Sequence, residues 1–236
     1  MKKMIQDFYR KAEGFNRYLM SNKKRVKEIK AIYSANKKYF GKKVLDVACG
    51  GGILGFLIEN YGKRYTGIDI NPDMITNAKE YAKSIGSKNK FIIGDARKKR
   101  LAGRFDTITC LGNALCHFNT MDLIDIFKNI NQNTHKGSFF IVDYRDIVKL
   151  LFDCKWKKRL LEKHKGRNSL NITRTCDTEK GELVIDSYSK RSHARFTHAI
   201  LSPFVIGPMM DYLGWKLLKR KELKQWNGWI DVYKRL

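Results

Sequence analysis

The sequence predicts an α/β fold built on a seven-stranded, mostly parallel sheet flanked by helices. Three observations support this prediction. Short apolar runs alternate with helical stretches between residues 41 and 146, a cluster of glycines follows the first run, and residues 139–142 are apolar without interruption. Strand, crossover helix and strand in repeated order form a parallel sheet, and an uninterrupted apolar run suits a strand that is buried on both faces.

The expected elements follow from the spacing of the apolar residues. A spacing of three and four residues predicts a helix, whereas a short apolar run between turn residues predicts a strand. Strands are expected at residues 43–47, 65–70, 91–93, 107–110 and 138–142, and helices at residues 53–61, 74–85 and 123–130.

Residues 1–40 are expected to form an N-terminal helical cap, in which Ser21 or Asn22 caps a second helix. Glycine at position 41 ends this helical pattern.

The second half of the chain predicts an insertion in the core. Residues 147–202 are expected to form a lid over the acceptor site, with a basic helix over residues 147–168 followed by antiparallel strands. Residues 203–236 return to the core that they share with residues 41–146, and contribute a short helix and two final strands.

The composition suits one domain of 236 residues with a strongly basic balance. There are 48 Lys and Arg against 23 Asp and Glu, a formal net charge of +25. Such a charge attracts nucleic acid or acidic partners. Lysine is spread along the whole chain, however, and a high lysine content is also typical of the amino-acid composition of thermophilic proteomes. Nucleic-acid binding through a basic surface therefore stays open.

The cysteines and the hydropathy indicate a cytoplasmic protein. Five cysteines without a C-x-x-C pair predict reduced thiols and no structural zinc site. No apolar run approaches the roughly 20 residues of a membrane span, and no apolar segment follows the N-terminal lysines. We therefore expect no metal and no membrane contact, and either a monomer or a homodimer.

The glycine cluster at residues 50–55 has the spacing G-x-G-x-x-G between an expected strand and an expected helix. Glycines let the backbone bend tightly and approach a ligand beside a helix N-terminus. Asp69 ends the next strand about 20 residues later, where a carboxylate binds both hydroxyls of a ribose. Nicotinamide and flavin enzymes share these features, so they define a nucleotide site without identifying its ligand.

Asp46 narrows the choice of ligand. It lies inside the first strand just before the turn, close to where a dinucleotide would place its pyrophosphate. A carboxylate there repels phosphate and suits an ammonium group. A ligand with a ribose at one end and an α-amino group at the other is S-adenosylmethionine, which we expect as the cofactor.

Three segments resemble the motifs of class I S-adenosylmethionine-dependent methyltransferases, whose sheet is Rossmann-like. Residues 44–52 (Val-Leu-Asp-Val-Ala-Cys-Gly-Gly-Gly) are similar to the first motif and residues 67–72 (Gly-Ile-Asp-Ile-Asn-Pro) to the second. Residues 94–97 (Gly-Asp-Ala-Arg) look like the motif that reads adenine. The resemblance covers residues 40–145 and implies cofactor contacts at Asp46, Ala48, Gly50, Gly52, Asp69, Ile70, Met74, Asp95 and Ala96.

The resemblance also implies a role for each of these residues. Asp46 reaches the amino group of the methionine, while the glycines shape the turn and Asp69 binds the ribose. Ile70 and Met74 border the adenine, and Asp95 with the backbone of residue 96 reads its edge. Position 48 departs from the many members that carry glycine there, although alanine also occurs. The alternative is a domain of the same architecture that has lost its cofactor.

The loop after the expected fourth strand is similar to a stretch of the glycine N-methyltransferase group. Residues 111–117 (Leu-Gly-Asn-Ala-Leu-Cys-His) resemble that group's Leu-Gly-Asn-Ser-x-x-His. Residues 142–146 (Val-Asp-Tyr-Arg-Asp) resemble its Ile-Asp-His-Arg-Asn-Tyr-Asp, with tyrosine in place of the histidine and Asp146-Ile147 in place of Asn-Tyr. Because of these departures, the acceptor need not be glycine.

This second resemblance implies that Leu111, Gly112 and His117 lie along the cofactor and that Asn113 faces the acceptor. It also implies that Arg145 clamps a carboxylate of the acceptor, which a planar guanidinium binds through two oxygens at once.

Plainer interpretations stay open for these residues. Asn113 can form a turn after a strand, and His117 can be a hydrogen-bonded loop histidine. Arg145 can pair with a neighbouring aspartate at the surface. Tyr9 and Tyr18 are candidates to cap the active site from the N-terminal helix, although aromatic residues on helices more often belong to a core.

Three functions follow. The first is an S-adenosylmethionine-dependent methyltransferase, acting on the amine of a small molecule that carries a carboxylate. The second is an RNA or protein methyltransferase that uses the basic surface. The third is a binding partner without enzymatic activity on the same scaffold.

Overall fold

The computed structural model describes residues 19–99, 101–153, 155–164, 167–189 and 193–236. Its first half consists of α2 (Lys23–Asn36), η2 (Lys37–Tyr39), β1 (Lys43–Val47), α3 (Ile53–Glu59), β2 (Arg64–Asp69), α4 (Pro72–Ser84), β3 (Lys90–Ile93), β4 (Phe105–Cys110), η3 (Ala114–His117), α5 (Thr120–Gln132) and β5 (Thr134–Arg145). Its second half consists of α6 (Ile147–Phe152), β6 (Arg159–His164), β7 (Arg167–Asp177), β8 (Glu182–Ser189), β9 (His193–Ala199), α7 (Pro203–Tyr212), β10 (Trp215–Leu223), η4 (Lys224–Trp226) and β11 (Gly228–Arg235).

The larger sheet has seven strands in the order β10-β11-β5-β4-β1-β2-β3. Strands β1 to β5 pair in parallel, whereas β11 pairs antiparallel with both β5 and β10. This topology confirms the predicted seven-stranded, mostly parallel sheet. The first strand has the predicted bounds, and the fifth is longer than predicted, with 12 residues.

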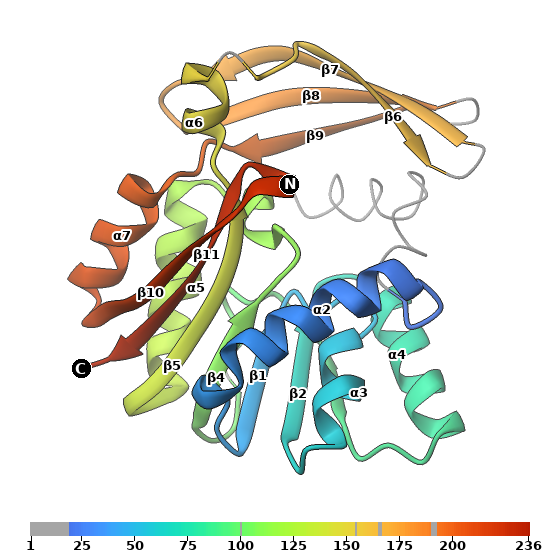
Figure 1. Ribbon diagram of the computed structural model, residues 1–236, viewed down its shortest axis with the longest axis vertical. Helices are drawn as coiled ribbons and strands as arrows, with labels where there is room; N and C mark the ends of the chain where they lie inside the picture. The colour runs from blue at the N-terminus through green and yellow to red at the C-terminus, as the bar shows by residue number, and fades with distance from the viewer. Residues whose placement is uncertain (1–18, 100, 154, 165–166, 190–192) are drawn as a thin grey trace.

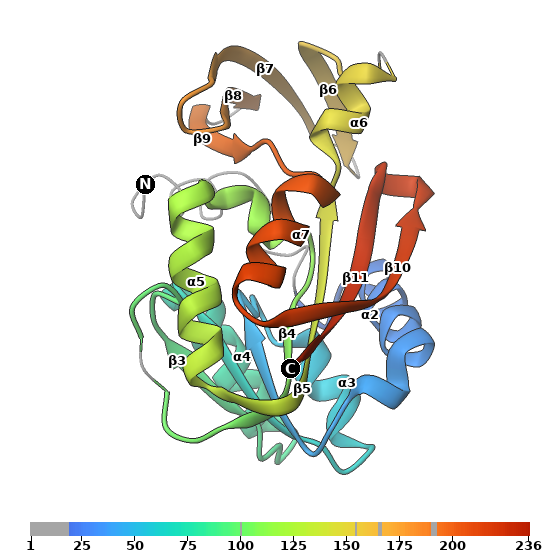
Figure 2. The same cartoon turned by 90° about the vertical axis from the view of Figure 1, so that its left-hand side faces the viewer.

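Helices cover both faces of this sheet, as Figures 1 and 2 show from two sides. On one face, Ile29 of α2, Ile53 of α3 and Ile75 of α4 belong to one buried apolar cluster. On the other face, Phe127 of α5 and Ile206 of α7 belong to a second cluster. Burial on both faces explains why the central strands are continuously apolar.

A second sheet, with the order β6-β7-β8-β9, lies above the carboxyl ends of the larger sheet in Figure 1. Ile147 and Leu150 of α6 attach it by packing against Leu183, Ile185 and Phe196. The antiparallel strands expected in the insertion are therefore present.

The helix predicted over residues 147–168 is wrong for most of its length. Helix α6 has only six residues, and β6 pairs antiparallel with β7 from Arg159 onward. Lysine, arginine and leucine are good helix formers, but intrinsic propensity is a small effect, and pairing with a neighbouring strand overrides it.

Helix α2 begins as predicted. The side chain of Asn22 accepts a hydrogen bond from the backbone N–H of Arg25 at 3.2 Å, which satisfies one donor of the first turn. Tyr9 and Tyr18 lie outside the described residues. Among the helices of the described ranges, none is long and apolar enough to cross a membrane.

A buried aspartate fastens the antiparallel side of the larger sheet. Asp231 of β11 is fully buried and accepts hydrogen bonds from the hydroxyls of Tyr144 on β5, at 2.7 Å, and Tyr233, at 3.0 Å. Arg220 of β10 donates to both carboxylate oxygens, each at 2.8 Å. One carboxylate therefore links three adjacent strands.

Replacing Asp231 by alanine would leave two hydroxyls and a largely buried guanidinium without their acceptor. We expect Asp231→Ala to lower the free energy of unfolding by about 3 kcal/mol, measured by urea denaturation. Asp211→Ala, at an exposed position of α7, is the matched control and should change it by less than about 0.5 kcal/mol. Equal losses in both variants would contradict the role of the buried carboxylate.

Candidate cofactor and acceptor site

A pocket of about 810 Å³, its open mouth included, lies at the carboxyl ends of β1, β2, β3 and β4. Ligands of open α/β sheets bind at this edge. The residues that line the pocket are Ala48, Gly50, Ile68, Asp69, Ile70, Asn71, Met74, Gly94, Asp95, Ala96, Arg97, Leu111, Gly112, Ala114, His117 and Phe118.

The turn after β1 needs residues that tolerate a left-handed backbone. Ala48, Gly50 and Gly52 have φ angles of 55°, 54° and 77°. A Cβ atom at Gly52 would collide with the ring of Phe91, so this glycine allows the helix to approach β3 closely. The positive φ of Ala48 explains why a glycine at this position suits the turn equally well.

Asp69 ties the turn to the end of β2. Its carboxylate accepts hydrogen bonds from the backbone N–H groups of Gly50, at 2.8 Å, and Asn71, at 2.9 Å. Each oxygen keeps a further lone pair for a ligand. Asn71 caps α4 through its side-chain oxygen, while its Nδ2 is buried in the pocket wall without a hydrogen-bond partner.

Asp46 lies beneath the pocket rather than in its wall. Its carboxylate accepts hydrogen bonds from Tyr65 Oη at 2.8 Å and Thr109 Oγ1 at 2.6 Å. Burial, together with the charges of Asp69 and Asp143, raises the pKa of Asp46 to about 7 against the opposing effect of these two hydrogen bonds. Asp46 therefore acts on the pocket through its charge rather than by forming a wall.

Asp143 adds a third carboxylate from the end of β5. One oxygen accepts the N–H groups of Gly112 and Asn113, both at 2.7 Å, and so shapes the loop after β4. The other oxygen, Oδ2, is buried without a hydrogen-bond partner. The buried carboxylates of Asp46 and Asp143 and the half-buried carboxylate of Asp69 thus give this edge of the sheet a negative potential.

The expected adenine reader, Asp95, is engaged by a neighbour in the pocket wall. Arg97 donates to both of its oxygens, at 2.9 and 2.6 Å, and to Asp122 of α5 at 2.6 Å. The Arg97 guanidinium lowers the pKa of Asp95. Asp95 is therefore ionised and rigidly held, and a ligand contact would share its oxygens with Arg97.

Asn113 links the core to the second sheet. Its Oδ1 accepts the backbone N–H of Arg145 at 2.8 Å, so its Nδ2 faces Nε2 of His198 on β9 at 3.5 Å. His198 donates Nδ1–H to the carbonyl of Ala199 at 3.2 Å, because a carbonyl only accepts. Nε2 of His198 therefore carries a lone pair, and the imidazole is neutral.

Arg145 lies beside this group rather than in the pocket wall. Its Nε donates to the carbonyl of Trp226 at 3.2 Å. Burial lowers the pKa of His198, and the neighbouring His117 and the charge of Arg145 act in the same direction. A cation and two histidines thus meet where the pocket adjoins β9.

Ten of the twelve predicted cofactor residues line the pocket, and Asp46 and Gly52 lie behind its wall. Of the predicted catalytic residues, Asn113 and Arg145 are brought together next to His117, whereas both tyrosines fall outside the described part of the chain. Sequence reasoning missed Asn71, Arg97 and His198. The helix-capping position of Asn71 at a strand end was a usable signal, but His198 had none, because only the tertiary fold brings β9 to this loop.

Comparisons with known proteins agree with this architecture. Residues 44–137 match the family model described as a methyltransferase domain. The ubiquinone biosynthesis O-methyltransferase of Vibrio parahaemolyticus is 40% identical over 128 residues, which are 52% of this chain and 53% of that protein. The chain thus aligns with only about half the length of this relative.

Two crystal structures share most of the fold. The PH0226 protein of Pyrococcus horikoshii is 26% identical, with a TM-score of 0.75 over 98% of this chain and 99% of that one. An S-adenosylmethionine-dependent methyltransferase of Clostridium acetobutylicum is 16% identical, with a TM-score of 0.73 over 88% of this chain and 89% of that one.

The fold and the pocket define a nucleotide-binding α/β domain of the methyltransferase type. Residues 44–137 form a domain of the class I S-adenosylmethionine-dependent methyltransferase type, as the three motifs predicted, and S-adenosylmethionine is the cofactor of this type of domain.

The described residues fit this cofactor chemically. Its sulfonium and ammonium groups are cations, and the buried carboxylates of Asp46 and Asp143, with the half-buried carboxylate of Asp69, offer the opposite charge. Asp69 can hold the ribose hydroxyls with its remaining lone pairs. The unpartnered Nδ2 of Asn71 offers a donor in the same wall, beside the apolar side chain of Met74.

His198 makes the stability of the protein depend on pH. Burial lowers its pKa from 6.5 to about 3, and the neighbouring charges of His117 and Arg145 act in the same direction. The unfolded state therefore binds the proton more readily. The stability from neutral His198 is complete above pH 6.5 and is lost as the pH falls toward 3.

Between pH 6.5 and about pH 4.5, the free energy of unfolding should fall by about 2 kcal/mol more in the unchanged protein than in His198→Gln, measured by urea denaturation. His135→Gln is the control with the opposite sign. Hydrogen bonds to the carbonyl of residue 136 and to Asp106 raise the pKa of His135, so its proton stabilises the folded state in acid. Identical pH profiles for all three proteins would disprove this assignment.

Proposed function

We propose that the protein transfers the methyl group of S-adenosylmethionine to the amine of a small acceptor that carries a carboxylate. The observation that carries this proposal is the junction of the pocket with the second sheet. There the side chain of Asn113 faces His198 and accepts the backbone N–H of Arg145, while His117 of the pocket wall and the charge of Arg145 lie close enough to affect the pKa of His198.

Each group in this junction suits such an acceptor. The guanidinium of Arg145 attracts a carboxylate, and its charge also disfavours protonation of a nearby amine. An amine must be uncharged to attack, and the lone pair on Nε2 of His198 can accept its N–H in place of the Nδ2–H of Asn113, which lies 3.5 Å away. When bound, S-adenosylmethionine supplies the activated methyl group.

The second sheet helps to exclude water from this junction. His198 is 8% exposed, and its strand packs against η3 through Asn113. Exclusion of water strengthens every charge interaction inside the site and aligns the reacting groups. The acceptor specificity would then depend on the inserted segment.

The acceptor atom is the open choice within this proposal, because the Vibrio relative is named for O-methylation. The direct test is a transfer assay with labelled S-adenosylmethionine against amines, phenols, RNA and protein extract. Transfer to phenols alone would replace the amine by a hydroxyl acceptor. Transfer to RNA or protein alone would overturn the small-molecule assignment. A melting temperature that does not respond to S-adenosylmethionine would favour a scaffold without activity.

Substitution of Arg145 tests directly whether this residue binds the carboxylate of the acceptor. We expect Arg145→Ala to raise the KM for an amine that bears a carboxylate by about 10- to 100-fold, because a charged hydrogen bond is lost. The Kd for S-adenosylmethionine should stay unchanged. Arg145→Lys should have a KM between those of the unchanged protein and Arg145→Ala, since lysine keeps the charge but lacks the planar fork.

The matched control is Lys79→Ala, which removes an exposed cation of α4 away from the junction. It should leave both constants unchanged. If Arg145→Ala raised the KM equally for amines with and without a carboxylate, the clamp would be wrong while methyl transfer itself still stood.

A further inference from the structure

The edge of the larger sheet opposite the pocket carries a row of exposed cations. Along the parallel strands, Lys43 and Arg64 stand at the starts of β1 and β2 and Lys90 at the start of β3. Arg104 precedes β4, and Lys136 lies near the start of β5. All five are exposed. Parallel pairing brings these strand starts to one edge.

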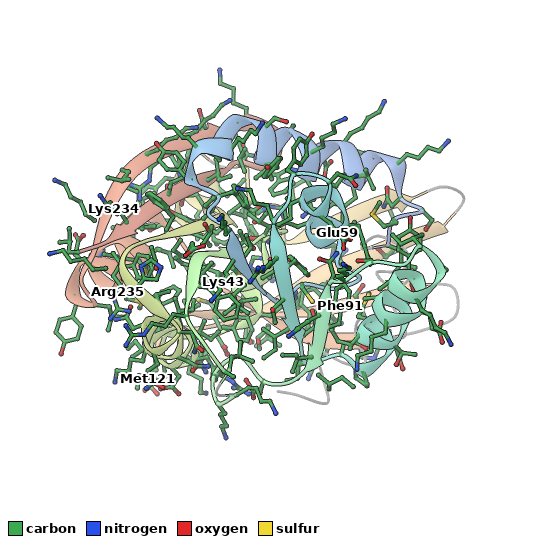
Figure 3. All side chains as sticks on the ribbon, turned by 90° about the horizontal axis from the view of Figure 1, so that it is seen from below. Lys43, Glu59, Phe91, Met121, Lys234 and Arg235 are labelled. Carbon is green, nitrogen blue, oxygen red and sulfur yellow. The ribbon has the colours of Figure 1, made fainter. Side chains whose placement is uncertain are left out.

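The two antiparallel strands continue the row. Lys216 near the start of β10 pairs with Lys234 near the end of β11, and Lys234 pairs in turn with Phe139 of β5. Both lysines are exposed. Figure 3 looks onto this edge, with Lys43 and Lys234 labelled. Six strand spacings of about 4.8 Å give the row a length of about 29 Å.

Like charges stand directly opposite each other within this row. Lys43 pairs in register with Arg64, and Lys216 with Lys234. Such pairs repel and destabilise a sheet. An anionic partner that spans the row would relieve this repulsion.

Few carboxylates of the described residues neutralise the row. Asp106 accepts hydrogen bonds from the backbone N–H of Lys43 and from His135, and Glu59 accepts from the backbone N–H of Lys88. Exposed Asp211 ends α7 near the same edge. The cations of the row outnumber these three groups.

The middle of the row is concave. A polar pocket of about 700 Å³, including open solvent, lies there, and Arg104, His135, Lys136 and Arg235 contribute to its lining. Arg235 is oriented by hydrogen bonds to the carbonyl of Asn131 and the hydroxyl of Thr134. A phosphate group would meet several oriented donors in this pocket.

We propose that this edge, the amino edge of the sheet, is a docking surface for the sugar-phosphate backbone of nucleic acid. A row of this length with repeated charges matches a polyanion rather than a single small anion. A flat anionic membrane would contact a concave polar pocket poorly, so the shape also favours a nucleic-acid strand. Binding through phosphates has no sequence preference.

This surface is distinct from the site of methyl transfer. Strands β1 and β2 have five and six residues, which separate the two edges by about 17–20 Å. Nucleic acid on the amino edge is therefore docked and not presented to the pocket. The inference stands independently of the identity of the methyl acceptor.

The test is fluorescence anisotropy of the full chain with labelled RNA and DNA of about 20 nucleotides, titrated over a range of salt. We expect binding of both near 0.1 M salt. The triple variant Lys43→Gln, Arg64→Gln, Lys136→Gln should bind at least about 30-fold more weakly, with the salt slope reduced by about 2 to 3. The response of its melting temperature to S-adenosylmethionine should be unchanged.

The matched control removes the same charge elsewhere, through Lys79→Gln, Lys98→Gln and Lys128→Gln, which are all exposed. It should keep most of the affinity. Equal weakening in both triple variants would show that only net charge matters and would overturn the proposal. So would the absence of binding at low salt, or binding to vesicles of phosphatidylserine and phosphatidylcholine with none to RNA or DNA.

Discussion

Parallel pairing of β1 to β5 is the constraint on which the rest of the structure depends. It gathers the starts of these strands at one edge and their ends at the other. Residues far apart in the chain, such as Asp46 and Thr109, thereby become neighbours without any direct sequence relation. Each edge acquires its own chemistry from the residue types that begin or end the strands.

The carboxyl edge concentrates buried charge, and the backbone holds it in place. The carboxylates of Asp69 and Asp143 each accept two N–H groups of the loops that follow β1, β2 and β4. These bonds offset part of the cost of burial and fix the loops that form the pocket. A cationic ligand can offset the part of this cost that remains. The two carboxylates therefore both fix the loops of the folded protein and attract the ligand.

The sequence predicted the elements of the core well, because a strand buried on both faces has an apolar pattern that needs no tertiary information. Ten of the residues that the motifs predicted to bind the cofactor line one pocket, since each lies at the end of such a strand or in the segment that directly follows it. The insertion was harder. Residues after Phe152 have good helix formers, yet β6 forms because β7 is available to pair with it.

The sequence could not predict which hydrogen bonds the side chains of the site form within the protein. Asp95 was expected to be available to adenine, but Arg97, two residues further on, holds both of its oxygens. Asn113 was expected to face an acceptor, while its amide oxygen is used by the backbone of Arg145. Hydrogen bonds of this kind depend on distances that emerge only when the strands are assembled.

The opposite chemistry of the two edges gives the molecule a permanent electric moment along its strands. Lys43 and Arg64 stand where β1 and β2 begin, and Asp46 and Asp69 lie at or near their ends. In the field of a polyanion, a body with such a moment rotates before contact, with its cationic edge leading. The open mouth of the pocket then points into bulk solvent, where small molecules arrive by free diffusion.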